Sequence, residues 1–117
     1  MKLSIIDRII ILKSVLPESG TIADLKLMRS IRSKINFTNE EYSKFKISTP
    51  SYGIIQIDEV TEDMQARVME YSITSEEATL LKRYASIQDQ NGWVTESSLD
   101  TIEMLLDYST EDTIKTE

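Results

Sequence analysis

Carboxylates are the side chains of this chain that are best placed to do chemistry, because most alternatives are missing. The 117 residues include 20 Asp and Glu but no His and no Cys. Nucleophilic Ser-His and Cys-His pairs, thiol redox chemistry and ordinary zinc sites are therefore excluded. The catalytic option that remains is a pair of acids held across a cleft, as glycosidases and metal-dependent nucleases require.

No recognisable catalytic or cofactor motif accompanies these acids. Twenty carboxylates form pairs by chance, so a pair alone indicates little. The three glycines, Gly20, Gly53 and Gly92, lie too far apart to make a Gly-rich phosphate cradle. We therefore predict a protein that is not an enzyme and uses no cofactor or metal, and we keep a carboxylate-based enzyme as the third alternative.

The densest group of acids lies in residues 58–63, where four carboxylates occur in six residues: Asp58, Glu59, Glu62 and Asp63. Hard cations require several converging oxygen ligands, which such a segment could partly supply. The segment lacks the alternating Asp or Asn and the central Gly of a calcium loop. Clustered like charges usually stay in water, so we predict a solvated hairpin tip that presents an acidic surface.

Charge is divided unevenly along the chain. Residues 1–48 carry nine Lys and Arg against five Asp and Glu, a net charge of +4. Residues 49–117 carry four against fifteen, a net charge of −11, so that the chain has a net charge of −7. The acidic half suggests an alternative function, a nucleic-acid mimic that occupies the basic groove of a host nuclease.

A helix predicted over residues 22–35 has a basic face opposite its apolar face. The apolar face carries Leu27, Ile31 and Ile35 with Met28 beside them, and the other face carries five candidate interface residues: Ile22, Leu25, Lys26, Arg29 and Arg32. This face could be solvated or paired within the chain, could contact a protein partner, or could contact phosphates. The net charge of −7 and the lack of interleaved aromatic residues disfavour nucleic acid, and of the two binding uses we favour the protein interface.

Three further residues near the C-terminal end are candidates for an interface. Trp93 follows the Asn91-Gly92 turn, where its ring could pack over two helix ends or anchor a partner. Met104 and Tyr108 lie off the expected buried face of the last helix. They leave room for a self-association patch, so a homo-oligomer is one possible outcome.

The elements that position these residues are predicted from caps and periodicity. Thr38 with Glu41 and Thr74 with Glu77 have the spacing of capping boxes, and Phe37 can staple onto Tyr42. Apolar spacing and turn signals indicate five helices and a two-stranded hairpin, with helices at 4–16, 22–35, 39–45, 75–89 and 96–108, strands at 52–57 and 67–73, and a connection at 58–66. We predict an α+β fold with three N-terminal helices, an antiparallel β-hairpin and two C-terminal helices.

The apolar patterns also predict which side chains are buried. The first helix is apolar around most of its surface and should be central in the core, with a stripe of Ile5, Ile9, Leu12 and Leu16. The strand at 67–73 should turn Met69, Tyr71 and Ile73 inward. The last helix should bury Leu99, Ile102 and Leu106.

The chain length and hydropathy predict one globular domain. We place the domain at residues 1–108 and a polar, frayed tail at residues 109–117. No apolar run is long enough for a membrane span or a signal peptide, so we expect no membrane partner and a cytoplasmic location.

Several short segments resemble small phage and prophage proteins of similar length. The similarity lies in LSIIDR (3–8), LPESGT (16–21), FTNEE (37–41) and ITSEE (73–77), with Asn91-Gly92 and Thr95. The resemblance implies a phage or prophage origin, with the host cytoplasm as the location, and implies no activity. We therefore predict a non-catalytic accessory protein that binds another protein or assembles with itself.

Overall fold

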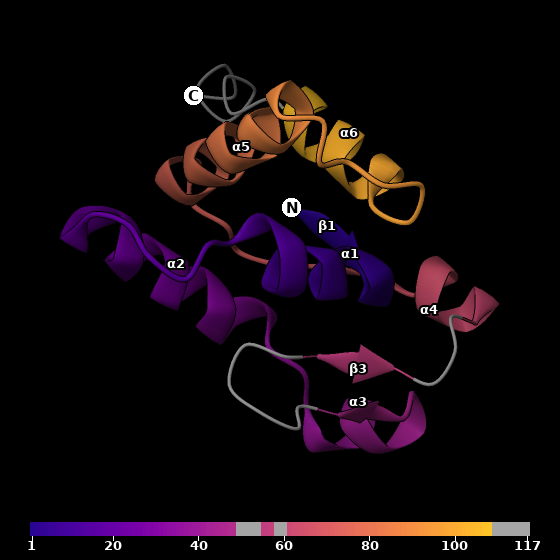
Figure 1. Cartoon of the computed structure of the whole chain (residues 1–117). Helices are drawn as coiled ribbons and strands as arrows, with labels where there is room; N and C mark the ends of the chain where they lie inside the picture. The colour runs from indigo at the N-terminus through magenta and orange to yellow at the C-terminus, as the bar shows by residue number, and fades with distance from the viewer. Residues whose placement is uncertain (49–54, 58–60, 109–117) are drawn as a thin grey trace, which may run out of the picture.

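The computed structural model describes residues 1–48, 55–57 and 61–108, and the predicted tail at 109–117 lies outside this part (Figure 1). The predicted α+β class is confirmed, although the arrangement differs. The elements in chain order are β1 (Lys2–Ser4), α1 (Ile5–Ile10), the π-helical turn η1 (Ile11–Val15), α2 (Ile22–Ile35), α3 (Asn39–Lys44), β2 (Ile47–Ser48), β3 (Gln56–Ile57), α4 (Glu62–Ala66), β4 (Val68–Glu70), α5 (Ser75–Gln90) and α6 (Leu99–Asp107).

Side-chain caps start most of these helices where the sequence predicts. Ser4, Thr38 and Thr74 each accept a hydrogen bond from the backbone N–H three residues on, and Asp7, Glu41 and Glu77 complete the capping boxes. The predicted contact of Phe37 with Tyr42 is also present, with ring centroids 5.8 Å apart. Each such cap is typically worth about 1 kcal/mol.

The predicted pairing of the two strands is wrong. Of the strand predicted at 52–57, the described residues 55–57 include β3, which pairs with β2. The strand predicted at 67–73 is shortened to β4, which pairs with β1. Part of the expected connection is helical, because Thr61 caps α4 and Met64 of that helix is fully buried. The helix α4 therefore lies between β3 and β4 in the chain, and Met69, expected to face inward, is half exposed.

The first helix ends in a π turn before Pro17. The Leu16 N–H donates to the Ile11 carbonyl at 3.1 Å, five residues back. In an α-helix these two residues would point about 140° apart. The wider turn brings them to one side, and Ile11, Val15 and Leu16 are all buried while Leu12 is only half-buried.

Two apolar cores lie on opposite sides of the first helix. Figure 1 shows α5 and α6 on one side of α1, and α3 and β3 on the other. The first core joins η1 and α2 to α5 and α6 through Met28, Leu81 and Ile102. The second core surrounds Ile5 and Ile9 with Phe37, Phe45, Ile47 and Met64. The first helix is central, as predicted.

The last helix begins at Leu99 rather than at residue 96. A tight turn precedes it, in which the Thr95 N–H donates to the Ser98 hydroxyl and the Ser98 N–H donates to the Thr95 carbonyl. The buried face of α6 is Thr101, Ile102 and Leu105, whereas Leu99 is 40% exposed and Leu106 only half-buried. No helix in the described part of the chain is both long enough and apolar enough to cross a membrane.

The turn after α5 gives a test of the backbone conformation. Gly92 has φ +68°, and a Cβ added there would meet no atom within 4 Å. Because the left-handed conformation alone penalises a side chain, we expect Gly92→Ala to lower the free energy of unfolding by about 1 kcal/mol. Gly92→Asn should cost less, because Asn tolerates this conformation. Urea unfolding measures both, and equal stability of Gly92→Ala and wild type would contradict the assignment.

Candidate functional site

The first helix directs side chains to two opposite sides. Ile6 and Ile10 lie one turn apart, and Arg8, two residues from each, points the other way in helical geometry. Arg8 is buried between the two cores, while Ile6, Ile10 and Lys13 line an open groove. One helix therefore positions both the buried charge and the surface hollow.

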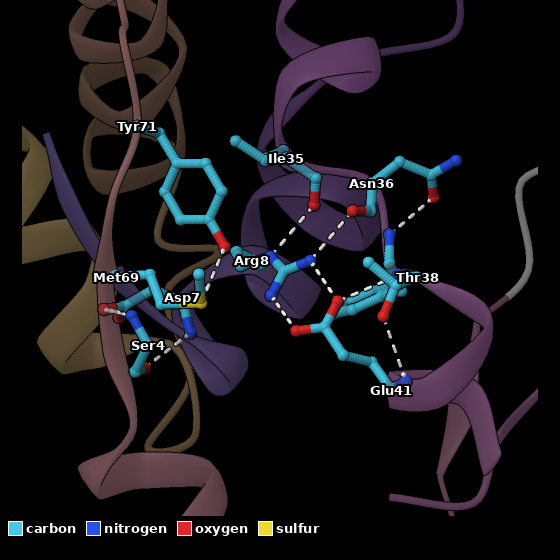
Figure 2. Close-up of polar contacts among 10 residues, drawn as sticks. Ser4, Asp7, Arg8, Ile35, Asn36, Thr38, Glu41, Met69 and Tyr71 are labelled. Carbon is cyan, nitrogen blue, oxygen red and sulfur yellow. Dashed lines mark hydrogen bonds and ion pairs between the residues drawn. The ribbon is translucent and has the colours of Figure 1, made fainter. Parts of the chain in front are cut away.

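The Arg8 guanidinium joins the end of α2 to the start of α3 (Figure 2). Its Nη1 and Nη2 atoms lie 2.6 and 2.9 Å from the two Glu41 carboxylate oxygens, a bidentate pair. Its Nε donates to the Ile35 carbonyl at 3.0 Å, and Nη2 donates to the Asn36 carbonyl at 2.8 Å. These carbonyls end α2, where the helix dipole favours a cation.

Aromatic rings complete the surroundings of this guanidinium. The Phe37 and Tyr71 ring centroids lie 4.5 and 5.2 Å from the Arg8 Cζ atom. The Arg8 side chain is 2% exposed, and four of the five N–H donors of its guanidinium are hydrogen bonded. The group has almost no capacity left for a ligand, so Arg8 is structural.

Internal contacts shift the pKa values of two glutamates and one tyrosine. The hydrogen bonds from Arg8 hold the pKa of the Glu41 carboxyl below its ordinary value. Burial acts to raise the pKa of the Glu77 carboxyl, but hydrogen bonds from Lys34, Ser30 and the Thr74 backbone lower it overall. Burial raises the pKa of the Tyr71 phenol. The causes of all three shifts lie within the fold.

Asp7 attaches the last helix to the first. One carboxylate oxygen accepts the Ser4 N–H at 3.0 Å, and the other accepts the Thr101 hydroxyl at 2.7 Å. Thr101 and Ser4 are both buried. This contact places the N-terminal end of α6 beside α1, where it forms one wall of the groove.

The groove is an open hollow of about 540 Å³ between α1, β3, α4 and α6. Its apolar lining includes Ile6, Ile9, Ile10, Ile55 and Ile57. Its charged lining is three acids and one base, Asp7, Glu96, Asp100 and Lys13. An apolar surface flanked by net negative charge can bind by apolar contact and by attraction of cations.

The three acids of the groove have no cationic partner among the described residues. Within residues 1–48, 55–57 and 61–108, Asp7, Glu96 and Asp100 form no ion pair, whereas Glu41, Glu77 and Asp24 pair with Arg8, Lys34 and Arg83. In the same ranges no group of three or more Asp or Glu side chains is arranged to hold a metal ion. The features that the groove does offer are apolar surface and negative charge, which make it a candidate for binding.

The predicted basic face of α2 is only partly available. Ile22, Lys26 and Arg29 are exposed, and Ile22 is 76% exposed. Leu25 instead packs against the first core, and Arg32 is half-buried and donates to the Pro17 carbonyl at 3.1 Å.

The three C-terminal candidates for an interface differ in exposure. Trp93 is 62% exposed, so its ring does not pack over helix ends in the described structure. Met104 and Tyr108 pack partly against the first core. The structure does not place any of these three residues in the lining of the groove.

The structure describes only two of the four residues of the predicted acidic surface. Asp58 and Glu59 lie outside the described residues. Glu62 is exposed in the first turn of α4, and Asp63 lies 3.3 Å from Arg67 and 3.8 Å from Lys44. These exposed ion pairs partly neutralise the acidic segment.

Sequence reasoning missed both Arg8 and the groove. Arg8 could have been identified from the sequence, because a charge within an almost wholly apolar helix must find a partner when that helix is central. No sequence pattern indicated the groove, since its walls come from four elements whose tertiary arrangement the sequence did not predict. Comparisons of the chain with protein-family models, curated proteins and solved structures find no match.

The lowered pKa of Glu77 predicts a pH dependence of stability. A glutamate with a folded-state pKa below its unfolded value of about 4.3 stabilises the fold above that pH, and this contribution is lost as pH falls through the folded pKa. Glu77→Gln should lower the free energy of unfolding at neutral pH by about 1–3 kcal/mol, and it should lose less further stability than wild type on acidification.

Urea unfolding from pH 7 down to pH 3 measures this difference. Glu76→Gln is the matched control, because Glu76 is the neighbouring residue, exposed and without an ion pair in the described part. The interpretation fails if Glu77→Gln and Glu76→Gln have the same pH profile.

Proposed function

We propose that this protein is a non-catalytic binding module and that its groove holds a segment of polypeptide that carries both apolar and basic side chains. The observation that carries the proposal is the combination of isoleucines and acids without cationic partners in one groove. Each kind of lining selects one property of the ligand. The isoleucines favour apolar side chains, and the acids favour Lys or Arg beside them.

The volume of the groove agrees with this class of ligand. At about 540 Å³ it can take one or two side chains of a partner, with the backbone of that partner remaining at the surface. The exposed positions of Glu96 and Asp100 allow long basic side chains to reach them from outside. A nucleic acid would be repelled by the same acids.

The internal ion pairs also support a binding role, because they occupy the buried charges of the fold. Arg8, Glu41, Lys34 and Glu77 are engaged within the fold. The groove contains Ser4, Ser97 and Thr101 hydroxyls, but the chain has no His to activate them. The contacts that remain available at the groove are those of recognition.

Peptide binding tests this function directly. The probes are two fluorescently labelled synthetic helices of equal length, one of Leu and Lys and one of Leu and Glu. Fluorescence anisotropy should show binding of the basic peptide alone. The Glu96→Lys/Asp100→Lys variant should bind it at least about tenfold more weakly, a change of about 1.4 kcal/mol.

The matched control is Glu76→Lys/Glu103→Lys, which makes the same charge change at exposed positions of α5 and α6 that do not line the groove. This variant should keep the wild-type affinity within about threefold. The proposal is wrong if the groove and control variants bind the basic peptide equally, or if wild type binds both peptides equally.

A further inference from the structure

One exposed stripe of this chain has the properties that the groove selects. Ile22, Lys26 and Arg29 follow one another on α2 at spacings of four and three, so they share a face about 10 Å long. Ile22 is the most exposed large apolar side chain of the described part. Neither Lys26 nor Arg29 forms an ion pair with any residue that the structure describes. We call these three residues the α2 stripe.

We propose that the groove binds the α2 stripe of a second copy of this chain. The inference rests on the proposed function, and it names the partner. Ile22 supplies the apolar side chain for the isoleucine lining, and Lys26 and Arg29 supply cations for Glu96 and Asp100. Ile22 is also the first residue of α2, so the positive end of the helix dipole faces the acidic groove.

The stripe and the groove are too far apart for one molecule to bind itself. Figure 1 shows the N-terminal end of α2 at the left edge of the molecule, and α4 and the start of α6, which form walls of the groove, at the right. The contact must therefore join two molecules. Because each molecule offers one stripe and one groove, the contact can close reciprocally in a twofold dimer or repeat from copy to copy.

Charge complementarity favours binding of the stripe to the groove. Residues 1–48, which include the stripe, have a net charge of +4, and residues 49–117, which include Glu96 and Asp100, have a net charge of −11. Two whole molecules of charge −7 repel one another, but this repulsion is screened beyond about 8 Å at physiological salt. The pairs in contact lie within that distance, so a docked stripe keeps its attraction.

The size of the contact sets the strength of the assembly. A single helical stripe in one groove lies at the small end of the range of specific interfaces. We therefore expect concentration-dependent association that is weaker at 1 M salt, where a Debye length of about 3 Å screens the contacting pairs, than at physiological salt. Lys13 is the one base in the charged lining of the groove, so Lys13→Glu should strengthen association.

Sedimentation of variants with reversed charges tests the inference. Wild type should gain mass with concentration, and Lys26→Glu/Arg29→Glu and Glu96→Lys/Asp100→Lys should each remain monomeric. The variant with all four changes should associate again, because the stripe is then acidic and the groove basic. Lys2→Glu/Lys82→Glu, two exposed cations outside the stripe and the groove, should behave like wild type.

The outcomes separate this inference from the function on which it rests. If wild type stays monomeric and Lys13→Glu does not promote association, the second copy is not the partner, whether or not the groove binds the basic peptide. Association that survives either pair of reversals, or that the fourfold variant does not restore, also overturns it. If the groove in addition fails to bind the basic peptide, the proposed function is lost as well.

Discussion

A buried guanidinium determines how this small protein holds together. Arg8 lies between the two apolar cores, with Ile35 of the first core and Phe37 of the second core in contact with it. Removing an ion from water costs several kcal/mol unless strong partners replace the water. Glu41 and the carbonyls at the end of α2 are those partners. The direction of the chain between α2 and α3 is therefore fixed by one side chain of α1.

The same arrangement leaves the opposite side of α1 available. Because Arg8 turns inward, Ile6 and Ile10 face the other way and become part of the groove. Asp7 fixes α6 beside them through Thr101. Arg8 and Lys34 are thus paired inside with Glu41 and Glu77. The exposed charges Glu96, Asp100, Lys26 and Arg29 remain for contacts outside. Our proposals of a polypeptide groove and of self-association through the α2 stripe both depend on this separation.

Local interactions were predictable from the sequence, and distant ones were not. The boxes at Thr38 and Thr74 formed as predicted because cap and partner are three residues apart. The pairing of β1 with β4 joins residues almost seventy positions apart, and nothing local indicates it. Leu99 was expected to be buried, but the turn at Thr95 makes it the first residue of α6, where it is 40% exposed. The exposed α2 stripe was foreseen from helical periodicity, whereas the groove depends on the tertiary arrangement.

The free energy of unfolding of Arg8→Met, measured in urea beside Arg29→Met, tests the central role of Arg8 most directly. Both changes replace arginine with an unbranched apolar side chain, one between the cores and one on the exposed face of α2. Arg8→Met should lose about 3–5 kcal/mol because Glu41 is left without its partner, and Arg29→Met should change by no more than about 0.5 kcal/mol. Similar stability of the two variants would contradict the account.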